Sequence, residues 1–218
     1  LRADNNGEGG ILALYALLRK MKRKWIYLLA IIGASTLLAD GIITPAITVT
    51  TAIEGLESIS PHLPVIPITL GIITIIFFVQ RFGTESIGKS FGVFMLIWFL
   101  LLGVTGAFSI TSYPLILKAF NPYYAAMLLA KSPEWFLILG AVFLCTTGAE
   151  ALYSDLGHCG RKNITISWLF VKAMLILNYL GQGAWVLNHI QTASSVNPFF
   201  SIMPQTMLIF AIFMATGA

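Results

Sequence analysis

Several apolar runs, separated by short polar loops, constrain the fold of this chain more than any other feature of the sequence. A helix needs about 20 apolar residues to cross the hydrocarbon core of a bilayer. Only 10% of the 218 residues are charged and 57% are hydrophobic, whereas a soluble domain has roughly 25% charged residues. The sequence therefore predicts an all-α polytopic membrane protein with a single transmembrane domain.

The apolar runs predict five complete spans and two partial segments. The spans cover about 25–56, 65–80, 90–110, 134–153 and 164–187, and the partial segments cover 1–24 and 200–218. The first span exceeds one straight crossing, so we expect a tilt, a kink at Pro45 or an extension beyond the bilayer. The stretch 111–133, rich in tyrosine and proline, is predicted to be interfacial, with one short helix as a candidate. The chain opens without methionine and its last apolar run is too short to span, so we expect a fragment truncated at both ends.

Lysine and arginine are distributed unevenly among the loops. Three segments, 19–24, 81–89 and 157–163, alternate with segments that hold only Lys118 and Lys131. The three segments hold nine of the 13 basic residues: Arg19, Lys20, Lys22, Arg23, Lys24, Arg81, Lys89, Arg161 and Lys162. Cytoplasmic loops carry an excess of lysine and arginine, so these segments are predicted to be cytoplasmic in a multi-pass protein of the cell membrane. The net charge of +4 is explained by topology and does not indicate nucleic-acid binding.

A polar stripe interrupts the first apolar run. A helix turns by about 100° per residue, which places five polar residues on one face: Asp40, Thr44, Thr48, Thr51 and Glu54. A charge at membrane depth is costly and should face a protected polar interior. Pro45 has no N–H to donate to the carbonyl of Gly41, which leaves that oxygen free. Carboxylate, hydroxyl and carbonyl oxygens suit a cation, so Asp40, Thr44 and Gly41 are predicted to form an ion site; a threonine-rich helix contact around a neutralised aspartate is the alternative.

Glu54 belongs to the same stripe but lies at a different depth. It is about fourteen residues, or roughly 21 Å along a straight helix, beyond Asp40. The two acids therefore cannot share one coordination shell, and we interpret Glu54 as an outer-mouth or proton-linked acid.

A second polar break occurs in the predicted fourth span. Thr146 and Glu150 are four residues apart and share a helical face. Gly148 permits local unwinding, which is tolerated at membrane depth only where the backbone lines a cavity or is buried in protein, and transporters place such broken helices at the substrate. Thr146 and Thr147 are therefore ion-site candidates, although both could instead bond local carbonyls. Glu150 is a candidate for proton coupling.

Three further polar residues are candidates for the transport pathway or a gate. Tyr153 follows the second polar break, and core packing is its alternative role. Asn178 and Gln182 are four residues apart in the fifth span. We favour a role for this amide pair in holding helices together, with a gate as the alternative.

Five stretches of the chain occur in a recognisable order. They are 2–10 (RADNNGEGG), 40–47 (DGIITPAI) with 54–56, 80–84 (QRFGT), 147–158 (TGAEALYSDLGH) and 177–184 (LNYLGQGA). Together they resemble the KUP/HAK/KT family of potassium uptake transporters and cover nearly the whole chain. The chain departs from the family pattern at Ala39, Val93 and Cys159, where the family usually has glycine, proline and phenylalanine.

The resemblance implies a LeuT-like inverted-repeat helical bundle of the amino acid–polyamine–cation superfamily. It implies potassium uptake coupled to proton entry, a symport by alternating access. Potassium would bind at Asp40 and Thr44, together with Thr146 or Thr147, and acids that match Glu54 and Glu150 are associated with transport. The family's first helix carries an aspartate and a tyrosine of the ion site, and nothing in this chain matches it.

The expected partners follow from this resemblance and from the composition. They are a potassium ion, a proton and the lipid bilayer, with a second copy of the chain as a candidate and no nucleic acid. We expect no cofactor, since K+ and H+ are transported. An organic-cation or amino-acid transporter on the same scaffold is the alternative function. An enzyme is not expected, because His62, His158 and His189 lie in predicted loops without a nucleophile and acid beside them.

Overall fold

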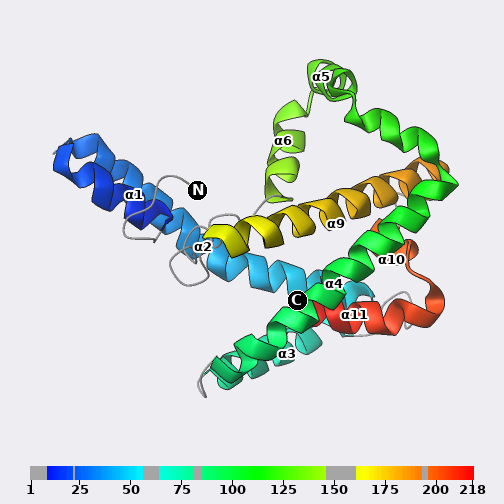
Figure 1. Ribbon diagram of the computed structural model, residues 1–218, viewed down its shortest axis with the longest axis horizontal. Helices are drawn as coiled ribbons and strands as arrows, with labels where there is room; N and C mark the ends of the chain where they lie inside the picture. Colours follow the sequence, from blue (N-terminus) through cyan, green and yellow to red (C-terminus); the bar gives the residue numbers. More distant parts are fainter. Residues whose placement is uncertain (1–8, 22, 56–63, 81–84, 146–160, 193–195) are drawn as a thin grey trace. The chain divides into compact units, whose positions relative to one another are not determined.

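Every regular element in the part of the chain that the structure describes is a helix (Figure 1). The computed structural model describes residues 9–21, 23–55, 64–80, 85–145, 161–192 and 196–218. The elements are α1 (Ile11–Leu18), η1 (Arg19–Met21), α2 (Lys24–Glu54), α3 (Val65–Gln80), α4 (Glu85–Ser112), η3 (Pro114–Phe120), α5 (Pro122–Lys131), α6 (Trp135–Leu144), α9 (Arg161–Asn188), α10 (Pro198–Ser201), η4 (Gln205–Met207) and α11 (Leu208–Gly217). The all-helical class predicted from the sequence is confirmed.

Three described helices are long and apolar enough to cross a membrane. They are Lys24–Glu54, Phe91–Ser112 and Lys162–Asn188, with mean hydropathies of 2.0, 2.3 and 1.5. Many of their large apolar side chains face outward, among them Ile42, Phe108 and Leu169, which are 75%, 78% and 73% exposed. In water such a surface would be strongly unfavourable, and it suits contact with lipid or with further apolar helices.

Two short helices begin at Asn-Pro pairs, for a local chemical reason. The side-chain oxygens of Asn121 and Asn197 accept hydrogen bonds of 3.0 Å from the backbone N–H groups of Tyr123 and Phe199. Proline follows at the first helical position, where its absent N–H is not needed. The stretch 111–133, which the sequence predicted to be interfacial with one short helix, holds two helical elements, η3 and α5.

Two predicted segments have different ends in the structure. The apolar segment expected from about residue 200 is divided into α10, η4 and α11, with Pro204 at the N-cap of η4. Helix α6 ends at Leu144, and at 1.5 Å per residue its ten residues extend only about 15 Å. The remainder of the predicted span, 146–153, lies outside the described residues.

The chain divides into two compact units, 1–39 with 117–170 and 40–116 with 171–218. In the first unit, α1 runs antiparallel to the start of α2: Ile11 packs on Gly33, and the rings of Tyr15 and Tyr27 lie 6.3 Å apart. In the second unit, α11 packs on α4 through Phe94 and Phe213, whose rings lie 6.4 Å apart. The buried side chains of this unit include Ala52, Ile53, Phe200, Ala211 and Met214.

Candidate ion-binding site

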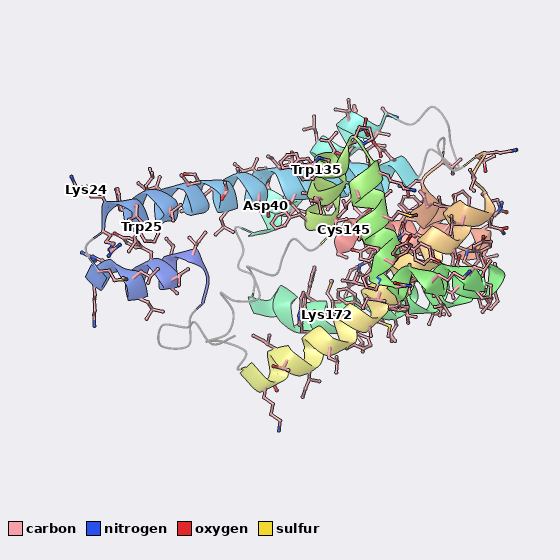
Figure 2. The ribbon with its side chains drawn as sticks, turned by 90° about the horizontal axis from the view of Figure 1, so that it is seen from above. Lys24, Trp25, Asp40, Trp135, Cys145 and Lys172 are labelled. Carbon is pink, nitrogen blue, oxygen red and sulfur yellow. The ribbon has the colours of Figure 1, made fainter. Side chains whose placement is uncertain are left out.

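Asp40 and Thr44 form a hydrogen-bonded pair in the middle of α2 (Asp40 is labelled in Figure 2). The hydroxyl of Thr44 donates to Oδ1 of Asp40 over 2.7 Å, and both residues are half-buried. The four-residue spacing places them on the same helical face, as predicted. Among the described residues, Thr44 is the one that hydrogen-bonds to this carboxylate.

Pro45 lies inside α2, and the helix continues through it to Glu54. Since proline has no N–H, the carbonyl of Gly41 lacks the donor that an ordinary residue at position 45 would supply. Gly41 is exposed, and a Cβ placed on it would meet no described atom within 4 Å. This turn of the helix therefore carries the Gly41 carbonyl beside the Asp40–Thr44 pair, and no described side chain covers the Cα of Gly41.

The neighbouring threonines use their hydroxyl groups differently from Thr44. Thr48 donates to the carbonyl oxygens of Thr44 and Pro45 over 2.8 and 3.2 Å, and Thr50 donates to the carbonyl of Ala46 over 2.7 Å. Both hydroxyls thus satisfy local backbone oxygens, as threonine commonly does within a helix. The Thr44 hydroxyl, by contrast, donates to a carboxylate.

Glu54 is exposed at the last position of α2. The following residue, Gly55, is buried, and a Cβ on it would collide with the ring of Phe200. Because α2 is continuous from Asp40 to Glu54, the helix rise separates the two acids by roughly 21 Å. The structure does not bring Glu54 to the Asp40–Thr44 pair.

The candidates of the second polar break, Thr146, Thr147, Glu150 and Tyr153, lie outside the described residues. The described helix before them, α6, ends with Cys145 as its C-cap, whose N–H bonds to the carbonyl of Ala141 over 3.2 Å. These four candidates therefore stay predictions.

Asn178 and Gln182 lie on α9, where it meets α4. Asn178 is only 4% exposed, and its Oδ1 has no hydrogen-bond partner among the described residues. Gln182 is half-buried. A Cβ placed on Gly106 of α4 would collide with the carbonyl oxygen of Leu177 and lie 2.6 Å from Cα of Asn178. The backbones of α4 and α9 are therefore in direct contact beside Asn178.

Sequence reasoning did not identify this contact between α4 and α9 (Figure 1). A Cβ on Gly181 would lie 2.5 Å from Cα of Gly106, and Ser109 donates to the carbonyl of Gly181 over 2.8 Å. A signal was present, because small or polar residues recur every three positions on each helix: Gly103, Gly106 and Ser109 on α4, and Asn178, Gly181 and Ala184 on α9. Such small residues let membrane helices approach closely.

The contact also has a direction. Gly103 faces Met174, Gly106 faces Leu177 and Gly181, and Ser109 reaches Gly181, so residue numbers rise together along the two helices. The two helices therefore run the same way where they meet. The topology predicted from the basic loops also requires α4 and α9 to run in the same direction. The basic segments 81–89 and 157–163 are both predicted to be cytoplasmic, and each lies at the start of its helix.

Long apolar helices, a carboxylate–hydroxyl pair within one of them and a glycine contact between two others define a multi-pass helical membrane protein. The whole chain, residues 1–218, matches the family described as the K+ potassium transporter integral membrane domain. The chain therefore belongs to that family, and the resemblance identified from the five motifs is confirmed.

Similar proteins support the assignment to this family. The chain is 54% identical over 234 residues to a probable potassium transport system protein Kup of Latilactobacillus sakei, 51% over 224 residues to one of Flavobacterium psychrophilum, and 51% over 230 residues to Kup 1 of Lactococcus lactis. Each match covers 100% of this chain and 34% of the relative. The chain thus spans about a third of the length of these relatives. No solved structure matches it.

Proposed function

We propose that this chain is part of a transporter that takes up potassium together with protons by alternating access. The observation that carries the proposal is the half-buried Asp40–Thr44 pair in an apolar helix long enough to span a membrane. A carboxylate at membrane depth is expensive unless it serves a polar interior, so an ionisable residue there indicates a functional site. The family membership and the transport proteins among its relatives support the same assignment.

The proposed potassium ligands are the Asp40 carboxylate, the Thr44 hydroxyl and the Gly41 carbonyl. One negative charge balances one monovalent cation, and the neutral oxygens replace part of its hydration shell without adding charge. Thr44 now donates to Asp40, but a hydroxyl oxygen keeps lone pairs that can accept a cation while the proton remains on the carboxylate. The pair can therefore bind the ion from adjacent oxygens on one helical face.

The remaining roles extend this proposal. Glu54 and Glu150 are proposed as proton-linked acids, and Thr146 or Thr147 as an ion ligand from the second polar break. The LeuT-like inverted-repeat bundle is the proposed scaffold, with potassium, protons and lipid as partners. For Asn178 the burial beside Gly106 favours packing over gating. An organic-cation or amino-acid substrate has no support among the relatives named above.

The central test is Asp40→Asn in the full-length protein, expressed in a strain that lacks potassium uptake. Asparagine keeps the size of the side chain but removes its charge. A carboxylate about 4 Å from a cation contributes on the order of 4 kcal/mol at an effective dielectric constant of about 20, so uptake should fall about a thousandfold. Growth at limiting potassium and potassium flux are the measurements.

A matched control removes another carboxylate from the same chain. Glu134 is exposed at the N-cap of α6 and makes no side-chain cap hydrogen bond, so Glu134→Gln should leave uptake unchanged. Immunoblots of the membrane fraction would show that both variants accumulate. Normal growth of the Asp40→Asn strain at normal protein abundance would refute the assignment of Asp40 as an ion ligand.

A further inference from the structure

A polar hollow lies where α1 and η1 meet the start of α2. Its volume is about 260 Å³, and its lining includes Arg19, Arg23 and Lys24 together with Tyr15 and Tyr27. The three basic residues are exposed, and no aspartate or glutamate is among its described lining residues. Among the described residues, positive charge therefore gathers around a cavity that two tyrosines also line.

An apolar hollow of about 110 Å³ adjoins the polar one between the same two helices. Ile11, Leu14, Trp25 and Leu29 contribute to its lining. Tyr15, Leu18 and Ile26 line both hollows, so the two lie next to each other at these side chains. Both hollows are formed by the antiparallel packing of α1 on α2. The contact of Ile11 with Gly33 and the paired rings of Tyr15 and Tyr27 hold these two helices together.

The residues at the start of α2 have the pattern expected at the edge of a membrane. Helix α2 begins at Lys24 and is apolar from Trp25 onward. Trp25 and Tyr27 are 53% and 59% exposed, and Figure 2 shows Lys24 and Trp25 at this end of the helix, next to α1. Exposed tryptophan and tyrosine beside lysine and arginine are typical of the lipid headgroup level. The polar hollow is then at headgroup depth, and the apolar hollow is at the depth of the first acyl carbons.

We propose that these two hollows bind one anionic phospholipid of the leaflet that faces the basic segment 19–24. The phosphate accepts hydrogen bonds from Arg19, Arg23 and Lys24, and an acyl chain lies against Leu14, Trp25 and Leu29. A free phosphate would satisfy the polar hollow alone, whereas the adjoining apolar hollow requires a ligand with a hydrocarbon part. Guanidinium groups match phosphate oxygens in geometry as well as charge. The site is separate from the Asp40–Thr44 pair and is independent of the proposed transport function.

The test compares lipids on the purified full-length protein. Short-chain dioctanoyl phosphatidylglycerol, dioctanoyl phosphatidylcholine and inorganic phosphate are titrated separately, and the apparent affinity is read from the shift in thermal unfolding. Phosphatidylglycerol should bind roughly tenfold more tightly than phosphatidylcholine, because each basic residue near the phosphate strengthens attraction to an anionic headgroup. Arg19→Gln combined with Arg23→Gln should abolish this preference.

The matched control removes the same charge elsewhere. Lys118 of η3 and Lys131 of α5 are exposed basic residues outside the two hollows, so Lys118→Gln with Lys131→Gln should keep the tenfold preference. If the protein with both arginine substitutions fails to accumulate, Lys24→Gln alone is tested instead. It should lower the preference for phosphatidylglycerol several-fold. Leu29→Gln should weaken both lipids and leave the ratio unchanged, since it alters only the apolar hollow.

Three results would overturn the proposal. The preference could survive loss of both arginines, or it could fall equally in the Lys118 and Lys131 control, which would show a general effect of net charge. Alternatively, inorganic phosphate could displace phosphatidylglycerol at an equal concentration, which would mean that the polar hollow takes soluble anions. None of these results would bear on potassium uptake, so the two proposals fail separately.

Discussion

The polar residues in the middle of α2 differ from those at the α4–α9 contact in where their hydrogen bonds go. In α2, Thr44 bonds to Asp40 four residues away and both remain half-exposed. At the α4–α9 contact, Ser109 bonds to Gly181, which is 72 residues away, and Asn178 beside it is 4% exposed. The first set is satisfied within one helix and stays open on one side, whereas the second set joins two helices and is covered.

This difference separates two uses of polar groups in an apolar helix. A group that joins helices must reach another backbone, so it lies among glycines that allow the approach. A group that binds a transported ion must exchange partners, so a local hydrogen bond and open space suit it better. The local hydrogen bond of Thr44 to Asp40 fits the second use, which we propose for these two residues, while the bond of Ser109 to Gly181 between two helices fits the first.

The largest expected effect on stability comes from filling the space between the backbones of α4 and α9. In Gly106→Ala the new Cβ would collide with the carbonyl oxygen of Leu177. Backbone atoms cannot move aside as a flexible side chain can, so overpacking should lower the free energy of unfolding by about 1–3 kcal/mol or more. Thermal unfolding of the purified protein and its abundance in membranes are the measurements.

Gly92→Ala is the control on the same helix. A Cβ on Gly92 would meet no described atom within 4 Å, so alanine should keep stability or raise it by up to about 1 kcal/mol through its better helix propensity. Equal unfolding temperatures for the two alanine variants would show that the backbones of α4 and α9 are not in direct contact at Gly106.

The sequence predicted the helices and the Asp40–Thr44 pair because both depend on short-range patterns. Apolar runs set the helix lengths, and a four-residue spacing in a helix brings two side chains together whatever surrounds it. The α4–α9 contact was not predicted, since the choice of which helices meet depends on packing between residues such as Gly106 and Gly181 that are distant in sequence. The three-residue recurrence of small residues pointed to a contact surface but not to its partner.

Smaller departures from the predicted helices also have local causes. The start of the short helix α5 could have been placed at Asn121-Pro122, since asparagine at the N-cap and proline at the first position are a helix-start signal. The break between α10 and α11 follows from Pro204, which cannot donate to a preceding carbonyl. Hydropathy alone does not register either signal, because both depend on single residues within otherwise apolar stretches.

An intermediate effect, on the apparent affinity for potassium, is expected for Thr44→Val. This variant tests the proposed role of Thr44 as an ion ligand. Valine has nearly the same shape as threonine but cannot donate to Asp40 or offer an oxygen to a cation. Hydrogen bonds that involve a charged group contribute about 1.5–3 kcal/mol, so the apparent affinity for potassium should fall roughly tenfold or more. The potassium concentration at half-maximal uptake is the measurement, with protein abundance unchanged.

Thr50→Val is the control for that variant. The Thr50 hydroxyl donates to the carbonyl of Ala46 on the same helix and not to the carboxylate. Its loss should leave the half-maximal potassium concentration within about twofold of the parent, since that carbonyl retains its helical partner. If the two valine variants shift the potassium dependence equally, the Thr44–Asp40 hydrogen bond has no special part in ion binding.

The smallest expected effect is that of Ser109→Ala at the α4–α9 contact. Alanine removes the 2.8 Å hydrogen bond to the carbonyl of Gly181 while keeping the small size that the contact needs. Side-chain hydrogen bonds between membrane helices contribute about 0.6 kcal/mol on average, so the free energy of unfolding should fall by about that amount. Thr111→Val, which removes a hydroxyl bonded within α4 to the carbonyl of Phe108, should change it by less than about 0.5 kcal/mol. Equilibrium unfolding in detergent, run in parallel on Ser109→Ala, Thr111→Val and Gly106→Ala, is the measurement. If Ser109→Ala is as damaging as Gly106→Ala, the hydroxyl, rather than the close approach of two glycines, is what holds α4 and α9 together.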